Sequence, residues 1–271
     1  VLFQVKQKEN NLDFNFIGDI SNKEATKKIK AIFDLDFNLN KFYKYLNNQP
    51  ELADMTNFCR DLRLFLAKDK FECVISSVCS ANNSIVRWTK SIDDIKKSWG
   101  NKYTYSEKDY FTFPDVSDFK NIYCDDVEEF ECCSNLNNPG ECINNLKSCG
   151  VGYRAPYMKK ASEIFTLEMD LDDISKMSYD EAFDTMLKVP GVGPKVADCI
   201  LLYGFNFRQA FPTDVWIKRI VSYLYFDGKD INVSKIREFG MEEFGDYAGY
   251  VQLYLFHYAR MSGLMKKLKG M

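Results

Sequence analysis

The alternation of apolar and polar residues near the start of the chain predicts two antiparallel β-strands. Phe3 and Val5 alternate with polar residues, Phe14 and Phe16 repeat the pattern, and Asn10-Asn11 stands between the two runs. Strict alternation is typical of half-buried strands, and a short polar break between two such runs predicts a hairpin. We therefore expect a β-hairpin over the first 20 residues.

From residue 40 onward, apolar residues recur every three to four positions, which is the period of amphipathic helices. The expected helices cover residues 40–47, 51–56, 72–78, 84–98, 140–149, 154–167, 180–188, 195–203, 214–225, 232–240 and 247–264. A capping signal at Asn22 predicts a further helix over 22–33, whereas 101–139 contain Pro114 and an acidic run and predict loops with short helices. The pattern predicts an α+β, mostly α-helical chain with an N-terminal sheet region, 1–39, and a helical region, 40–271.

Residues 180–203 combine two expected helices with a turn rich in glycine and proline. In Pro190-Gly191-Val192-Gly193-Pro194, the glycines allow close backbone approach and the prolines stiffen both ends. The free N–H groups and the positive dipole end at the start of the second helix suit a phosphate. The segment predicts a helix-hairpin-helix in which Gly191, Val192 and Gly193 contact a DNA phosphate. The alternative is a helix-turn-helix corner without a ligand.

Lys195 and Asp214 are the candidate catalytic pair. Lys195 lies in the first turn of the second helix, where the helix dipole disfavours a charged ammonium, and a neutral amine is a nucleophile. Asp214 starts the expected helix 214–225, and a helix N-terminus favours an ionised carboxylate. This pair predicts opening of an N-glycosidic bond, in which the amine captures C1′ and the carboxylate stabilises the positive sugar. The alternative is a solvated lysine and a simple helix cap.

Four motifs follow one another along the chain. They are an Asn-rich helix start at 79–87, a Gly-Tyr-Arg turn at 150–157, the hairpin with residues 195–199, and a C-terminal helix from 245. Together they resemble the 8-oxoguanine DNA glycosylase/AP lyase branch of the helix-hairpin-helix (HhH-GPD) glycosylases. The resemblance implies a small N-terminal sheet and two helical subdomains with the active site between them. It implies a bifunctional base-excision-repair enzyme that removes 8-oxoguanine opposite cytosine through a lysine Schiff base and then cleaves the strand by β-elimination.

The resemblance also implies a pocket for the extruded purine. Cys199, Gln252 and Phe256 would enclose and read the base. Gln252 and Phe256 are four residues apart and share a helix face. Glutamine offers the donor and the acceptor needed for a Watson–Crick edge, and phenylalanine offers a flat surface for stacking. Without the motif context, each of these residues would be read as part of the core.

A second implied group manages the gap that base flipping leaves in the duplex. Asn82 would fill the vacated space and Tyr153 would wedge beside it, while Arg87 and Arg154 would donate hydrogen bonds to the orphaned cytosine. Taken alone, the arginines equally suit phosphate contacts or surface ion pairs.

Two positions depart from the family pattern. Trp216 stands where the family often has a histidine that contacts a phosphate. The family also has a Gly-Gln-x-Phe-Arg-Trp segment before its first strand, and its glycine senses the proton that oxidation adds at N7. Because Phe3-Gln4-Val5 aligns with Phe-Arg-Trp, we expect that the chain as given starts inside the domain, after this glycine.

The charge balance constrains how the chain can hold DNA. It has 36 Lys and Arg against 39 Asp and Glu, a formal net charge of −3. Wide phosphate contact usually needs a basic domain, so we expect a small footprint with a local basic face. Its candidate residues are Lys195, Lys218, Arg219, Arg87, Arg154 and the tail 266–269, which by itself is read as a solvated terminus. No apolar run approaches a membrane span and no signal peptide is evident. We expect a monomer that acts on duplex DNA in the nucleus or cytoplasm, without a membrane.

The nine cysteines are odd in number and irregular in spacing, which predicts reduced thiols. Cys132, Cys133, Cys142 and Cys149 gather in the insertion 124–149, where they are candidate ligands of a metal or iron–sulfur site. Endonuclease III-like relatives carry their cysteine cluster after the catalytic aspartate, and no cysteine follows Cys199 here. We expect no metal among the site residues and no required cofactor, although hairpin carbonyls can hold one structural cation.

Three alternatives to this function stay open. An alkylpurine glycosylase would use Asp214 without needing Lys195. A pyrimidine glycosylase would be expected to have the late cysteine cluster. A non-catalytic helix-hairpin-helix module would grip duplex DNA without cutting it.

Overall fold

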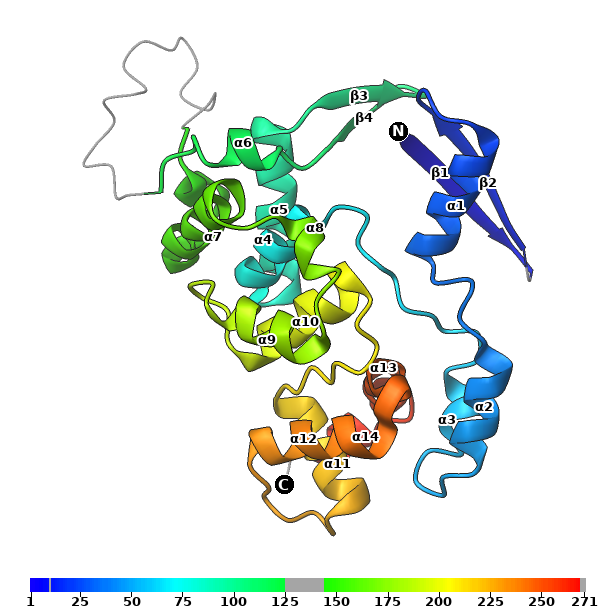
Figure 1. Cartoon of the computed structure of the whole chain (residues 1–271). Helices are drawn as coiled ribbons and strands as arrows, with labels where there is room; N and C mark the ends of the chain where they lie inside the picture. The colour runs from blue at the N-terminus through cyan, green and yellow to red at the C-terminus, as the bar shows by residue number, and fades with distance from the viewer. Residues whose placement is uncertain (10, 125–143, 269–271) are drawn as a thin grey trace.

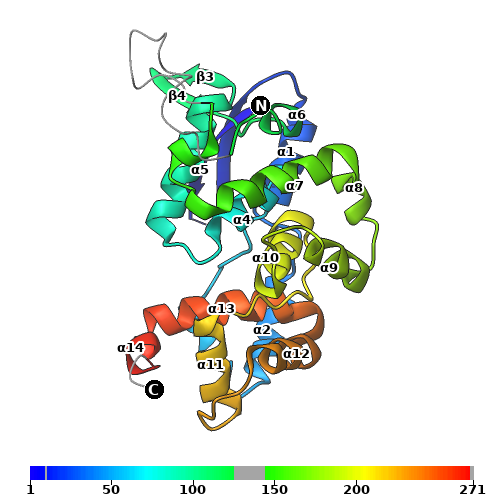
Figure 2. The same ribbon diagram turned by 90° about the vertical axis from the view of Figure 1, so that its left-hand side faces the viewer.

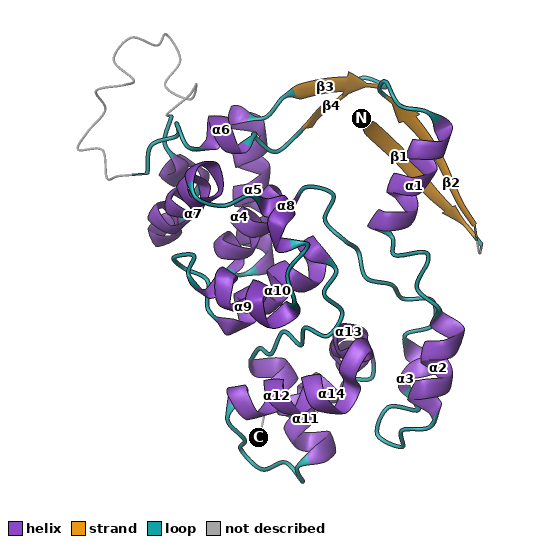
Figure 3. Cartoon of the chain, viewed as in Figure 1, coloured by secondary structure: helices purple, strands orange, loops and turns teal. Residues whose placement is uncertain are grey.

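The computed structural model describes residues 1–9, 11–124 and 144–268, which form a mostly helical molecule with two small β-hairpins (Figures 1 and 3). The predicted α+β, mostly helical class is confirmed. In chain order the elements are β1 (Leu2–Lys8), β2 (Asn11–Ile17), α1 (Asn22–Ile32), α2 (Leu39–Asn47), α3 (Met55–Phe58), α4 (Lys70–Ser80), α5 (Ile85–Trp99), β3 (Lys102–Tyr105), β4 (Lys108–Phe111), α6 (Val116–Phe119), the 3-10 turns η1 (Leu146–Cys149) and η2 (Gly152–Arg154), α7 (Ala155–Leu167), α8 (Leu171–Ile174), α9 (Tyr179–Leu187), α10 (Pro194–Phe205), α11 (Val215–Tyr225), α12 (Val233–Phe244), η3 (Gly245–Tyr247), α13 (Ala248–Met261) and α14 (Leu264–Leu268).

The N-terminal hairpin has the predicted antiparallel pairing. Phe3 lies opposite Phe16, and its ring also contacts Phe14 two residues away on the same face of β2. Helix α1 follows directly, so the predicted sheet region also holds a helix. Its cap is Ser21, one residue before the expected position, because the Ser21 hydroxyl accepts the Glu24 N–H and the Glu24 carboxylate accepts the Ser21 N–H.

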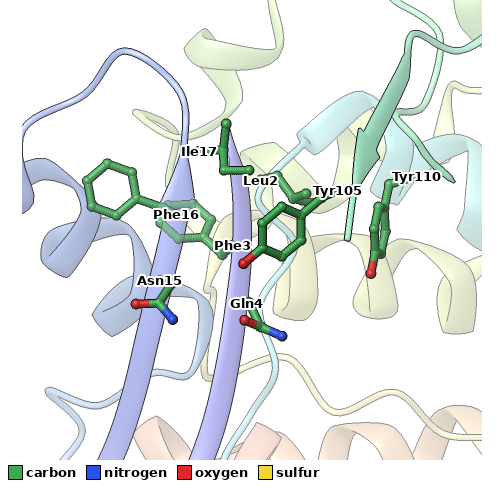
Figure 4. A pocket seen from close by; sticks show the side chains of 8 residues that line it. All are labelled: Leu2, Phe3, Gln4, Asn15, Phe16, Ile17, Tyr105 and Tyr110. Carbon is green, nitrogen blue, oxygen red and sulfur yellow. The ribbon is translucent and has the colours of Figure 1, made fainter. Parts of the chain in front are cut away.

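The second hairpin, β3–β4, corrects the expectation of loops and short helices from residue 101. Tyr103 pairs with Tyr110 in strands of only four residues, which are too short for a clear alternating pattern. The hairpin faces the first one, and Tyr105 and Tyr110 line a cavity of about 90 Å³ with Phe3 and its neighbours (Figure 4).

The helix expected at 140–149 lies only partly within the described residues, which leave out 125–143. Within the described part, only the 3-10 turn Leu146–Cys149 forms, so the prediction is wrong there. Gly150 follows this turn in the left-handed conformation, with φ +71°. Cys132, Cys133 and Cys142 also lie outside the described residues.

The helices form two groups, seen one above the other in Figure 2. In the upper group, α10 packs on α4 and α9, and α4 packs on α5 and α7. In the lower group, α13 packs on α11, α12 and α14, and it also contacts α3 from the N-terminal part. Phe42 of α2 joins this lower core through Tyr254, with ring centroids 5.1 Å apart. The lower group is therefore built from two segments of the chain, α2–α3 and α11–α14, and residues 206–214 connect α10 of the upper group to the second segment.

The C-terminal helix is shorter than expected. It ends at Met261, because Gly263 adopts φ +81° and breaks the helix. Helix α14 then docks on α11 and α13, with Leu268 buried and Lys267 Nζ donating to the Tyr223 hydroxyl at 2.7 Å. The tail is therefore helical and docked as far as Leu268, although Lys266 and Lys267 are exposed as expected for a solvated terminus. Over the residues that the structure describes, no helix has the length and apolarity needed to cross a membrane.

Candidate functional site

The hairpin between α9 and α10 presents an open backbone surface. Gly191 has φ +82°, and a Cβ there would lie 2.8 Å from the Cβ of Tyr157, so glycine is required by conformation and by space. Gly193 differs, because a Cβ there would meet nothing within 4 Å. The N–H groups of Gly193 and Lys195 find no acceptor among the described residues, whereas the Val192 N–H donates to the Val189 carbonyl. The N–H groups of Gly191 and Val196 likewise have no acceptor among the described residues, so the hairpin leaves four amides free for an anion such as phosphate.

Lys195 on α10 lies next to the Cys199 thiol, and Asp214 at the start of α11 is near enough for its charge to act on the same thiol. Cys199 lies one turn after Lys195. Burial raises the pKa of the Cys199 thiol, while the charge of Lys195 and its hydrogen bond to the thiol lower this pKa, and the charges of Asp198 and Asp214 raise it. Both predicted catalytic side chains therefore lie within electrostatic reach of one thiol. Among the described residues, Lys195 has no carboxylate within ion-pair distance.

Asp214 is held by the helix that it caps. Its Oδ1 accepts the N–H groups of Trp216 and Ile217 at 2.9 and 2.8 Å. Its Oδ2 accepts no hydrogen bond from the described residues and can face a ligand. Thr213 is buried just before it and donates to the Phe211 carbonyl at 2.9 Å. The carboxylate is therefore fixed in place with one oxygen unused.

A polar anchor that the sequence analysis missed holds the segment leading to Asp214. Arg208 Nη2 binds Asp34 Oδ1 at 2.6 Å, and the Tyr250 hydroxyl donates to Asp34 Oδ2 at 2.8 Å. Asp34 is buried and has φ +46°. Because 174 residues separate Asp34 from Arg208, no local pattern could have revealed this pair.

The residues of the expected base pocket lie on α10 and α13, two helices that touch each other. A Cβ on Gly249 would lie 2.4 Å from Leu202 Cδ1, so the two helices are in direct contact at this glycine. Leu202 comes three residues after Cys199, and Gln252 comes three residues after Gly249, which places Cys199 and Gln252 about one turn from the same contact. Phe256, half-buried, continues the Gln252 face.

The side-chain oxygen of Gln252, one of the expected pocket residues, has an unusual environment. Gln252 Oε1 is buried and accepts no hydrogen bond. A buried acceptor without a donor costs about 1–3 kcal/mol, so native proteins seldom keep one without a functional reason. The position suits a ligand that supplies the missing donor.

The residues expected at the vacated base position are brought together in part. Asn82 is exposed with φ +48° in the turn between α4 and α5. Arg154 is buried, donates from Nε to the Ala81 carbonyl and from Nη2 to the Asn82 carbonyl, both at 2.7 Å, and lies 4.5 Å from the Tyr153 ring centroid. Arg87 is exposed on the first turn of α5. Arg154 thus binds the Asn82 turn itself, and its contact with an opposite base stays a prediction.

A second missed group ties the two helical groups together next to the pocket. Asp198 of α10 is fully buried and is bound by Arg237 of α12, with Nε–Oδ2 at 2.7 Å. The Tyr179 hydroxyl of α9 donates to the same carboxylate. Burial raises the pKa of Asp198, and Arg237 opposes that rise. The only local signal is an aspartate inside an apolar helix.

The described residues contain no cluster of three or more histidine, cysteine or acidic side chains that could hold a metal ion. Cys149, the described member of the insertion's cysteine group, is buried, and burial raises its pKa.

Comparison with known proteins identifies the family. Residues 75–245 match the model of the HhH-GPD superfamily base excision DNA repair proteins, and residues 1–74 match the N-terminal domain of 8-oxoguanine DNA glycosylase. The chain belongs to this superfamily. The predicted resemblance is therefore confirmed for both parts of this HhH-GPD protein.

Similar proteins agree with this assignment. A probable N-glycosylase/DNA lyase of Methanothermobacter thermautotrophicus is 46% identical over 252 residues, covering 93% of this chain and 80% of the relative. A Clostridium acetobutylicum 8-oxoguanine glycosylase/lyase, solved with duplex DNA containing cytosine opposite the lesion, has a TM-score of 0.81 and 31% identity, covering 96% of this chain and 82% of that one. The prediction of a DNA glycosylase with lyase activity, of the 8-oxoguanine branch, is confirmed.

The fold alone does not select the lesion. A 3-methyladenine DNA glycosylase from Archaeoglobus fulgidus has a TM-score of 0.72 at 21% identity, covering 92% of this chain and 79% of that one.

Proposed function

We propose that Lys195 is the nucleophile of this glycosylase and that its substrate is 8-oxoguanine opposite cytosine in duplex DNA. The observation that carries the proposal is the setting of Lys195. Its side chain has no ion-pair partner among the described residues, and it lies beside the Cys199 thiol, which the charge of Asp214 also reaches. An ammonium held by a carboxylate could not attack a sugar, because its lone pair would be protonated. The similar Clostridium enzyme binds the same pair of bases.

The reaction follows from the two side chains. The neutral Lys195 amine bonds to C1′ of the flipped nucleotide, the N-glycosidic bond breaks, and the base leaves with the bonding electron pair and takes up a proton. Asp214 Oδ2, which accepts no described hydrogen bond, faces the positive charge that develops on the sugar. Loss of a proton from the amine and opening of the sugar ring give a Schiff base. Loss of a C2′ proton then expels the 3′ phosphate and nicks the strand.

Recognition of the base is assigned to the α10–α13 contact. The orphan Gln252 Oε1 accepts a hydrogen bond from the purine edge, while Cys199 and Phe256 cover its two faces. On the other strand, the Arg87 guanidinium, which has no partner among the described residues, donates to cytosine. Arg154 binds the Asn82 turn and keeps further N–H donors for the same base.

We further propose a monomer that needs no catalytic metal and works in a compartment that contains DNA. A cation at the hairpin would be held by backbone carbonyls of residues 188–193, because no described side-chain cluster suits one. Such a cation would help to position a phosphate and takes no part in the chemistry proposed above.

Borohydride trapping tests the nucleophile. Reduction of the Schiff base should join the protein to an 8-oxoguanine duplex, and Lys195→Gln should give no adduct. Lys188→Gln, which removes an exposed lysine from the same hairpin, is the matched control and should trap normally. Excision without trapping in the unmodified chain would instead indicate an alkylpurine-type glycosylase, and binding without either product would indicate a non-catalytic module.

Four duplexes with 8-oxoguanine opposite each base test the partner. The cytosine-paired lesion should be cut fastest, because the Arg87 guanidinium donates hydrogen bonds and cytosine presents two acceptors. Arg87→Gln should reduce this preference. Equal cutting of all four duplexes by the unmodified chain would contradict the assignment.

A further inference from the structure

A second cavity, of about 440 Å³, lies along α11 and has no role in the chemistry above. Val215, Lys218, Arg219 and Ser222 of α11 line one side of it, and the turn before α12 closes the other side with Lys229. Spacings of three, four and seven residues place these α11 side chains on one helix face. The cavity is therefore a continuous feature of α11.

The lining is basic in a chain whose overall charge is negative. Three cationic side chains, Lys218, Arg219 and Lys229, line the cavity with one carboxylate, that of Asp230, and Lys229 also lies 4.0 Å from Asp227 outside the lining. The whole chain, by contrast, carries a formal charge of −3. Arg219 also lies over the ring of Trp216, 5.5 Å from its centroid. A local excess of positive charge on an acidic protein indicates an anionic ligand.

A buried hydroxyl gives an independent indication of a ligand. Ser222 is 5% exposed, lines the cavity, and its Oγ is buried without a hydrogen-bond partner. A hydroxyl can donate one hydrogen bond, so an acceptor entering the cavity would satisfy it. A phosphate oxygen combines that acceptor with the charge that the lysines and the arginine require.

The position of the cavity relative to Asp214 identifies the source of the phosphate. Val215, at one end, directly follows Asp214, and Ser222 lies seven residues further along the helix, about 10 Å away. The phosphates of one strand follow at about 3.4 Å along the helix axis of DNA. We propose that this cavity binds a backbone phosphate of the damaged strand within about three nucleotides of the flipped base. The proposal rests on the DNA glycosylase function given above.

In the protein without DNA, Asp230 binds Lys218, the side chain that would contact the phosphate. Its carboxylate contacts Lys218 Nζ at 2.5 Å, and this contact lowers the pKa of Asp230 below its ordinary value. The Asp230 side chain is 90% exposed, so the pair is weak and a phosphate can displace it. Removing the charge of Lys218 should therefore weaken DNA binding, whereas removing the charge of Asp230 should strengthen it.

Duplex affinity over a salt series tests these directions. All variants are made in the Lys195→Gln background, and a gel of each binding reaction checks that the DNA stays intact, so that a failure of the proposed nucleophile is seen separately from a failure of the phosphate site. Lys218→Gln should weaken binding roughly tenfold and reduce the salt slope by about one phosphate contact. Asp230→Asn should tighten binding a few-fold, because it frees Lys218. The matched controls Lys176→Gln and Asp173→Asn, which break a 2.7 Å surface pair on and after α8, should change neither value.

Neutral methylphosphonates locate the contact. One such linkage is placed in turn at each of the three phosphates on either side of the lesion. At one position it should weaken binding to the parent but cause no further loss with Lys218→Gln. The proposal is overturned if no position behaves in this way, if Lys218→Gln binds like the parent, or if Asp173→Asn tightens binding as much as Asp230→Asn does.

Discussion

Replacing Arg237 by methionine leaves the buried carboxylate of Asp198 without its ion-pair partner. Asp198 is fully buried, the Arg237 side chain is 16% exposed, and their closest atoms are 2.7 Å apart. Removing one partner of a buried pair costs about 3–5 kcal/mol. The unfolding entropy of 271 residues is roughly 0.6 kcal/mol/K, so the melting temperature should fall by roughly 5–9 °C.

The loss should depend on pH with a definite sign. Burial raises the pKa of Asp198 above its ordinary value of 3.8 even with Arg237 present. A carboxyl group with a raised pKa in the folded state favours folding below its unfolded pKa, and this contribution is lost as the pH rises through the folded value. Without Arg237 the pKa rises further, because the opposing charge is gone. The Arg237→Met deficit should therefore be smaller in mild acid than at neutral pH.

Urea and thermal unfolding, each in mild acid and at neutral pH, measure the loss of stability in Arg237→Met. Lys176→Met, which breaks an exposed ion pair with Asp173, is the control and should cost less than about 1 kcal/mol. Asp198→Asn combined with Arg237→Met should be more stable than Arg237→Met alone, because no charge is then buried. A deficit no larger than that of the control, or one that grows in acid, would refute the reasoning.

Three further predictions concern the site. Gly191→Ala should lower the free energy of unfolding by about 1–3 kcal/mol, because φ is +82° and the new Cβ meets Tyr157. Gly193→Ala should keep the melting temperature and only weaken duplex binding. Equal losses of melting temperature in the two variants would contradict this prediction. Gln252→Leu should melt no lower than the parent, because it removes a buried orphan acceptor, yet should lose 8-oxoguanine excision in a gel assay. Iodoacetamide labelling of Cys199, followed by mass spectrometry, should be slow in the native protein and slower still in Lys195→Gln. The reason is that burial raises the pKa of the thiol and the charge of Lys195 lowers it. Faster labelling in Lys195→Gln would contradict the contact between Lys195 and Cys199.

The elements that the sequence predicted well carry strong local signals. The hairpin at the start of the chain alternates through Phe3 and Val5, and the turn at Gly191 has two glycines between prolines. Predictions failed where the signal was short or came from elsewhere in the chain. Strands β3 and β4 have four residues each, and α14 packs on the preceding helix α13 and on α11.

The candidate site shows the same division. Motifs placed Lys195, Asp214 and Gln252 on the correct kinds of element, since helix starts and faces are written in local spacing. They could not reveal that Arg154 binds the Asn82 turn, or that Asp34 anchors Arg208, because these partners are 72 and 174 residues apart.

The sequence by itself determined the reactive groups and the local elements that present them. The lysine at a helix start, the aspartate at the next helix start and the glycine turn between helices all depend on neighbours within a few residues. Only the tertiary structure decided which of these groups meet. Helices α10 and α13 touch at Gly249, and Asp198 and Arg237 join the helical groups through burial. Such contacts are set by packing and desolvation between distant segments, which no local pattern encodes.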